Sequence, residues 1–207
     1  KKEDRFVKQR EPFWKNIRKL DKQLKLYLLV AFLFTLGNSS NAFLLLRAKS
    51  VGFSDTSVIL LYFIYNLTAS LLAIPAGKRS DMVGRKRLLV AGYLVFSLVY
   101  LGFAFAGSKP MMIGLFAMYG LYTAMITGVE RAYISEISPQ ELKGTMLGVH
   151  STIVGISLLP ASVIAGILWN TFGAAAPFMF GSAMSLIAAC LLLSLMKGGK
   201  HEYVNQS

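Results

Sequence analysis

The residues best suited to chemistry in this sequence are polar side chains placed inside long apolar runs. The first run is interrupted by Asn38-Ser39-Ser40-Asn41, and Asn66 lies within the second. The fourth run carries a further polar set, made up of Tyr119, Tyr122, Thr123, Thr127 and Glu130. Amides and hydroxyls of this kind bind a solute by donating and accepting hydrogen bonds. We therefore expect Asn38, Ser39, Asn41, Asn66, Tyr119, Tyr122, Thr123 and Thr127 to line a path for a small-molecule substrate. The stretch 38–41 could loosen the helix at a cavity, and the alternative is that it forms hydrogen bonds between helices.

Six apolar runs must position these side chains, and we place them at 25–46, 55–76, 88–106, 110–134, 144–169 and 175–196. Each run has about the 20 residues that an α-helix needs to cross the hydrocarbon core of a bilayer. Polar side chains in hydrocarbon are costly unless they face protein or water, so those of the first, second and fourth runs should face inward. The third and sixth runs carry little polarity and should have large lipid contact.

The charge distribution predicts the topology. The chain has 207 residues, is 55% hydrophobic and carries a net charge of +12. Most basic residues lie before the first run or at run ends, which is typical of membrane-surface charge and argues against nucleic acid as a partner. We expect residues 1–24 to be a cytoplasmic linker, 25–196 the six-span unit and 197–207 a cytoplasmic tail, so that both termini are cytoplasmic. The linker contains an amphipathic pattern that either lies on the lipid surface or forms no membrane contact.

The single cysteine, Cys190, excludes an internal disulfide and provides no cysteine-based metal cluster. The sequence accordingly predicts neither a metal nor a cofactor. A membrane-embedded hydrolase would need convergent His, Asp, Glu or activated Ser side chains, and the runs offer little beyond Glu130 and His150. We do not expect an enzyme.

The second and third runs are joined by a short basic stretch, Gly77-Lys78-Arg79-Ser80-Asp81-Met82-Val83-Gly84-Arg85-Lys86-Arg87-Leu88. Gly77 and Gly84 permit a tight turn, and Asp81 can pair with the neighbouring guanidinium groups. The order G-x-x-x-D-x-x-G-R-K-x-L resembles the cytoplasmic loop signature of the major facilitator superfamily of secondary transporters. The alternative is a generic basic loop on the cytoplasmic side.

Two further stretches resemble segments of the same superfamily. The connection after the fourth run, Tyr133-Ile134-Ser135-Glu136-Ile137-Ser138-Pro139-Gln140-Glu141-Leu142-Lys143-Gly144, is similar to a cytoplasmic loop found most clearly in its sugar-porter branch. This resemblance implies that Glu136 and Lys143 belong to a charge network between helix ends. Lys143 stands where arginine is usual, so the network is expected to be weaker or wired differently; the alternative is a pair of solvated charges. Residues 165–178 resemble the outer turn between the last two helices.

Together the three segments identify the chain as a member of the superfamily, with an all-α membrane fold of six transmembrane helices in a 3+3 inverted repeat. The resemblance implies a six-helix half-bundle, which we take as the second half, and transport by alternating access. It also implies that the first and fourth spans line the cavity and that the second and fifth contact the other six-helix half. Asp81, Arg85 and Lys86 would then latch one state of the carrier. The expected location is a bacterial cytoplasmic membrane.

Glu130 and Arg131 lie near the cytoplasmic end of the fourth span. One hypothesis makes Glu130 a proton-coupling carboxylate, because burial favours the protonated acid. The other makes the two residues a structural ion pair of the inner gate. His150, early in the fifth span, is either a hydrogen-bonded packing residue or a titrating switch.

A non-transporting sensor or scaffold with the same fold is the alternative function. Such a protein would bind a ligand without moving it across the membrane. Flux measurements distinguish it from a transporter.

Overall fold

The computed structural model describes residues 21–198, and every regular element in that range is helical. The elements are α2 (Lys22–Gly37), α3 (Ala42–Ser50), α4 (Asp55–Val83), α5 (Arg85–Phe105), α6 (Lys109–Ile137), the short 3-10 helix η1 (Gln140–Leu142), α7 (Lys143–Phe172) and α8 (Ala176–Gly198). Six stretches in this part of the chain are long and apolar enough to span a membrane, and α2 and α3 together form the first. The amphipathic pattern expected in the linker and the expected tail lie mostly outside the described residues.

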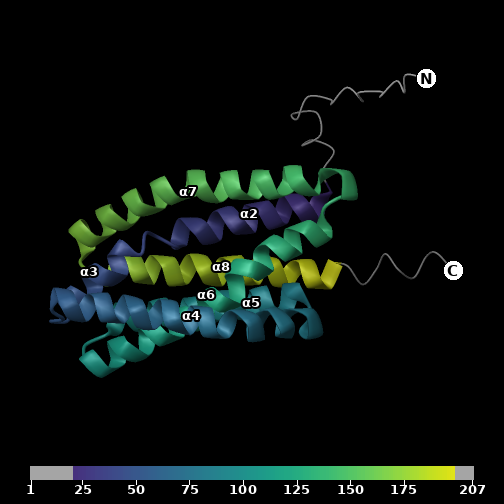
Figure 1. The fold of residues 1–207 in the computed structure, drawn as a ribbon. Coiled ribbons are helices and arrows are strands. Elements are labelled where there is room, and N and C mark those ends of the chain that lie inside the picture. The colour runs from purple at the N-terminus through teal and green to yellow at the C-terminus, as the bar shows by residue number, and fades with distance from the viewer. Residues whose placement is uncertain (1–20, 199–207) are drawn as a thin grey trace, which may run out of the picture.

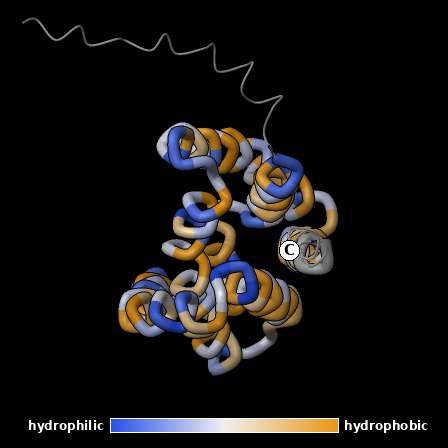
Figure 2. Tube along the Cα trace, turned by 90° about the vertical axis from the view of Figure 1, so that its right-hand side faces the viewer, coloured by the Kyte–Doolittle hydropathy of each residue, from blue (hydrophilic) through white to orange (hydrophobic). Residues whose placement is uncertain are grey.

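Successive spans run in opposite directions (Figure 1). The start of α2 and the end of α8 therefore lie at the same end of the bundle, together with the α4–α5 and α6–α7 connections. The other end holds the α3–α4, α5–α6 and α7–α8 connections. This is the all-α arrangement of six spans that the sequence predicts. Seen along the bundle, hydrophobic segments lie on outward as well as inward faces of the helices, as lipid contact requires (Figure 2).

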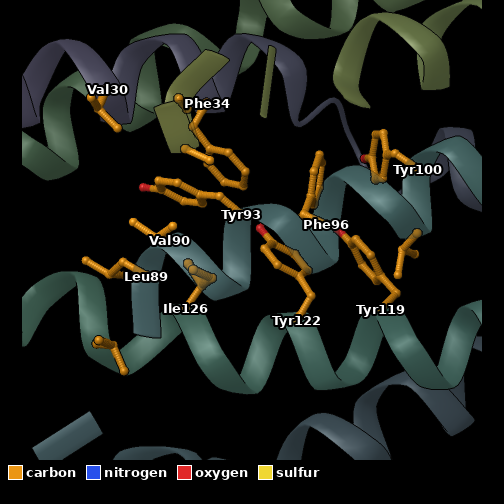
Figure 3. Packing of buried hydrophobic residues seen from close by; sticks show 14 of the residues in the cluster. Val30, Phe34, Leu89, Val90, Tyr93, Phe96, Tyr100, Tyr119, Tyr122 and Ile126 are labelled. Carbon is orange, nitrogen blue, oxygen red and sulfur yellow. The ribbon is translucent and has the colours of Figure 1, made fainter. Parts of the chain in front are cut away.

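The core of the bundle is aromatic and is built around α5. Tyr93, Phe96 and Tyr100 of α5 are buried, and they stack in a continuous row with residues of α2 and α6 (Figure 3). The ring centroids of Phe96 and Tyr100 are 3.9 Å apart, and those of Phe34 and Tyr93 are 4.3 Å apart. The expectation that this span has large lipid contact is wrong, because 61% of its apolar stretch is buried, more than in any other candidate span.

Helix α5 also packs closely against α8 through serine side chains. The hydroxyl oxygens of Ser97 and Ser182 are 2.9 Å apart, and each hydroxyl also lies within hydrogen-bond distance of the other residue's carbonyl oxygen. Ser185 donates to the carbonyl oxygen of Tyr93 at 2.7 Å. Reciprocal hydrogen bonds of this kind satisfy polar groups within the membrane and bring the two helices together.

Two helix boundaries differ from the sequence prediction. The expected turn at 77–87 is reduced to Gly84, whose φ of 97° ends α4 and allows α5 to start at the next residue. Gly77 lies inside α4, so the expectation that it forms part of the turn is wrong.

The C-terminal end of α5 is held by an arginine of the first span. Arg47 of α3 donates to the carbonyl oxygens of Phe103, Ala104 and Ala106 at 2.8–3.1 Å. These bonds satisfy carbonyl groups that have no partner within the helix.

Helices α4 and α7 are the least covered of the spans. Only 11% of the apolar stretch of α4 and 17% of that of α7 are buried within the bundle. Gly144, Gly148 and Gly155 of α7 have no atom within 4 Å of the position that a Cβ would take. These are the second and fifth spans, which the sequence analysis expects to contact another helical half.

The close approach of α2 and α8 at Gly181 generates a stability prediction. A Cβ at this position would collide with the backbone oxygen of Gly37 and the ring of Tyr100. Gly181→Ala should lower the free energy of unfolding by about 1–3 kcal/mol, the usual cost of overpacking. Gly114→Ala is the matched control, since nothing lies within 4 Å of its Cβ position. Denaturant titration of the detergent-purified protein measures both, and equal stability of the two variants would contradict the packing described here.

Candidate functional site

The first span is broken at the polar stretch, as the sequence suggests. Helix α2 ends at Gly37 and α3 begins at Ala42. The backbone amide of Asn38 still donates to the backbone carbonyl oxygen of Phe34 at 3.0 Å. The backbone amide of Phe43 donates to the backbone carbonyl oxygen of Ser40 at 3.0 Å. The break therefore exposes side chains and backbone within the depth of the bundle while most of the neighbouring backbone stays hydrogen-bonded.

Three tyrosines hold the broken segment in place. The side-chain amide of Asn38 donates to the Tyr122 hydroxyl at 3.2 Å and its carbonyl oxygen accepts from the Tyr100 hydroxyl at 3.4 Å. The Tyr119 hydroxyl donates to the side-chain oxygen of Asn41 at 3.1 Å. Figure 3 shows the rings of Tyr119 and Tyr122 extending from α6 toward α5, and the ring of Tyr100 on the other side of α5. Sequence reasoning missed Tyr100, because its span carries so little other polarity.

A cavity of about 280 Å³ lies against the broken segment, and we call it the central cavity. Every residue that lines it is uncharged: Asn38, Ser39, Ser40, Asn41, Tyr65, Tyr119, Tyr122, Thr123, Thr127 and Leu158. The Thr123 and Thr127 hydroxyls donate to backbone oxygens one turn earlier, at 2.9 Å each, so their oxygen lone pairs remain available as acceptors.

Seven of the eight expected pathway residues meet at the central cavity. Asn66 does not line this cavity. Its side-chain amide donates to the carbonyl oxygen of Tyr62, one turn earlier on α4, at 2.8 Å. Asn66 lines an adjoining cavity of about 560 Å³ between α4 and α6, together with Gly77, Asp81 and Arg85. This cavity shares Tyr65, Thr123 and Thr127 with the central cavity. Asn66 follows Tyr65 on α4, and of these two residues Tyr65 lines the central cavity. Tyr65, which the sequence analysis did not select, takes the expected place of Asn66 on α4.

A third cavity, of about 390 Å³, lies between α2, α6 and α7, and we call it the inner cavity. It shares Asn38, Tyr122, Thr127 and Leu158 with the central cavity, so the two are contiguous. Its other lining residues include three that carry or can carry charge, Glu130, Arg131 and His150.

The groups of the inner cavity are incompletely paired. The Glu130 carboxylate accepts from the Tyr93 hydroxyl at 3.2 Å. The expected ion pair between Glu130 and Arg131 is not formed, and within the described side chains Arg131 makes neither an ion pair nor a hydrogen bond. His150 is buried beside the Tyr27 ring, and its Nε2 atom has no hydrogen-bond partner.

The basic connection forms a charge network centred on Arg85. Its guanidinium contacts Asp81 at 3.5 Å and Glu136 at 3.2 Å, and it donates to the carbonyl oxygen of Ala132 at 3.1 Å. Arg85 thereby joins the end of α4, the start of α5 and the end of α6. Asp81 pairs with a neighbouring guanidinium as predicted.

The network differs from the one that the loop resemblance implies. Glu136 pairs with Arg85, whereas Lys143 begins α7 and forms no ion pair among the described side chains. Lys86 likewise has no ion-pair partner in that part of the chain. Among the residues described, no group of three or more His, Cys, Asp or Glu side chains could hold a metal ion.

Six apolar helices around contiguous polar cavities define an integral membrane protein of the transporter class. Residues 27–206 match the family model of the Major Facilitator Superfamily, and the chain belongs to this superfamily.

Relatives of the chain are described as transporters. The chain is 40% identical to an uncharacterized MFS-type transporter of Methanocaldococcus jannaschii, over 86% of this chain and 46% of that protein. It is 30% identical to the multi-drug resistance efflux pump PmrA homolog of Lactococcus lactis, over 73% and 38% of the two chains. It is 28% identical to the riboflavin transporter RibZ of Clostridioides difficile, over 60% and 28%. The chain thus spans less than half the length of these relatives.

The hydrogen bonds from Tyr100, Tyr119 and Tyr122 to Asn38 and Asn41, which we call the clamp, generate the second prediction. Tyr122→Phe keeps the ring but removes the acceptor of the Asn38 amide, so the free energy of unfolding should fall by about 0.6 kcal/mol, with ~1.7 kcal/mol as an upper bound for such bonds in membrane proteins. The control is Tyr62→Phe, because the exposed Tyr62 hydroxyl makes no hydrogen bond within residues 21–198. Unfolding in detergent provides the measurement, and a Tyr122→Phe protein no less stable than the control would rule out the clamp.

Proposed function

We propose that this chain is one six-helix half of a secondary transporter, the second half, and that it moves a small organic solute by alternating access. The observation that carries the proposal is the central cavity, which is lined by uncharged polar side chains from the break between α2 and α3, from α4 and from α6. Discontinuous helices with exposed polar groups at mid-membrane are typical solute sites in transporters. Membership of the superfamily supports the same conclusion.

The proposal includes a partner, namely the other six-helix half. Helices α4 and α7 leave long apolar faces uncovered, and exposed residues along them include Ile59, Phe63, Leu71, Ile156, Leu159 and Val163. Both helices also contribute residues to the cavities, so a partner packed across them would close the solute path. The latch formed by Asp81, Arg85 and Lys86 against that partner stays a prediction.

The proposed orientation places both termini in the cytoplasm. The basic residues at 78–87 gather at the same end of the bundle as the start of α2 and the end of α8. Under the positive-inside rule this end faces the cytoplasm. The membrane is then the cytoplasmic membrane of a prokaryotic cell, and the bacterial assignment stays a prediction.

The solute class follows from the lining of the central cavity. Uncharged amides, hydroxyls and tyrosine rings favour a neutral or weakly charged amphipathic molecule. Two relatives are described as a multi-drug resistance efflux pump and a riboflavin transporter, both of which carry organic solutes.

Flux through the full-length transporter in proteoliposomes tests the central cavity. Asn41→Ala should raise KM for the transported solute roughly 2- to 10-fold, the equivalent of one uncharged hydrogen bond. Asn170→Ala is the matched control, because Asn170 is exposed at the end of α7 and lines neither cavity. Unchanged KM for Asn41→Ala would contradict the assigned site. Ligand binding without any flux would instead identify the sensor or scaffold function.

We further propose that transport is coupled to protons and that the Glu130 carboxylate carries the proton. This carboxylate lines the inner cavity and forms no ion-pair contact within the described side chains. Glu130→Gln should abolish accumulation of solute driven by an imposed proton gradient, while exchange at equal solute concentrations continues. Glu141→Gln, in the exposed η1, is the control. Gradient-driven accumulation that survives in Glu130→Gln would exclude this role.

A further inference from the structure

The inner cavity is lined by a carboxylate and a guanidinium that make no direct ion-pair contact with each other. Glu130 and Arg131 both line it, yet neither belongs to an ion pair among the described side chains. Glu130 is half-buried and Arg131 is exposed, so a solute that enters the cavity can reach both groups. A ligand could therefore form a charge-assisted hydrogen bond with the Glu130 carboxylate and another with the Arg131 guanidinium.

The hydrogen-bonding capacity of the cavity is also largely unused. The Glu130 carboxylate has about four acceptor positions, and its one side-chain hydrogen bond within the described residues comes from Tyr93. The Arg131 guanidinium has five N–H donors in a planar fork that matches a carboxylate. His150 adds a buried Nε2 atom without a partner, on the α7 side of the same cavity.

We propose that the inner cavity binds a zwitterionic organic solute, with its ammonium group at Glu130 and its carboxylate at Arg131. The rest of the solute extends toward Asn38 and Tyr122, which line both this cavity and the central one. This inference rests on the proposed transport function and specifies its substrate class.

The charge balance distinguishes a zwitterion from other solutes. A cation satisfies Glu130 and leaves Arg131 unpaired, an anion does the reverse, and an uncharged solute pairs with neither. A zwitterion pairs with both residues at once. The inner cavity of about 390 Å³ lies within the ~300–1,000 Å³ range of small-molecule sites.

The test compares four probes that share one side chain and differ only in charge. Phenylalanine is the zwitterion, its methyl ester the cation, N-acetylphenylalanine the anion and N-acetylphenylalanine amide the neutral compound. The same four derivatives of leucine form a second series. Dissociation constants are measured by calorimetry on the full-length transporter in detergent. In at least one series the zwitterion should bind roughly 10-fold or more tighter than every other probe, since charge-assisted bonds add to its affinity.

Variants assign each charge to its residue. Arg131→Gln should remove the advantage of the zwitterion over the ester, and Glu130→Gln should remove its advantage over the N-acetyl compound. Arg131→Lys keeps the charge without the planar fork and should retain part of the preference. Arg87→Gln is the control, because Arg87 is exposed and lies outside both cavities, and it should leave the ranking unchanged.

Three results would overturn the inference. The ester or the neutral amide could bind as tightly as the zwitterion, the ranking could persist in both Gln variants, or no probe could bind to a protein that transports another solute. Failure of the proposed function has a different signature, because a folded protein that binds zwitterions but supports no flux in proteoliposomes would not be a transporter. The two failures are therefore separable.

Discussion

The break in the first span depends on hydrogen bonds from three tyrosines, and the solute site depends on that break. Inside a bilayer an interrupted helix is tolerated only where its freed polar groups find partners. At this break the backbone amides of Asn38 and Phe43 keep carbonyl partners, and the hydroxyls of Tyr100, Tyr119 and Tyr122 hydrogen-bond to the side chains of Asn38 and Asn41. Because the amides are held by hydroxyls that project from α5 and α6, the chain can open between α2 and α3 without losing its place in the bundle.

The same tyrosines, Tyr100 on α5 and Tyr119 and Tyr122 on α6, also belong to the aromatic core. Their rings pack into the aromatic core while their hydroxyls reach the broken segment, so one set of side chains contributes both to stability and to the site. Arginines then hold α5 at both ends, Arg85 at its start and Arg47 of α3 at its C-terminal carbonyl groups. Helix α4 packs mainly against α6 and α7 mainly against α2, so both lie at the edge of the bundle with their outer faces uncovered.

Equivalent spans of the two triplets have equivalent surroundings, which is what a 3+3 repeat requires. The first and fourth spans provide most of the central cavity, the second and fifth are the least covered, and the third and sixth pack together through Ser97 and Ser182. The charged groups do not follow this symmetry. Glu130 and Arg131 occur on the fourth span, and the corresponding part of the first span carries the uncharged amides. The neutral central cavity therefore adjoins two cavities that charged residues line, Glu130 and Arg131 in one and Asp81 and Arg85 in the other.

The sequence alone determined the number of spans, their alternation, the place of the break and the position of the turn near Gly84. These features depend on local hydropathy, on charge at span ends and on residue-specific backbone preferences. All three are properties of residues that lie close together in the sequence. Tertiary structure decided which polar side chains meet. It placed Asn66 outside the central cavity and Tyr100 at its clamp, paired Glu136 with Arg85 instead of Lys143, and left Glu130 and Arg131 unpaired. These outcomes depend on the rotation and crossing of helices far apart in sequence, which hydropathy does not encode.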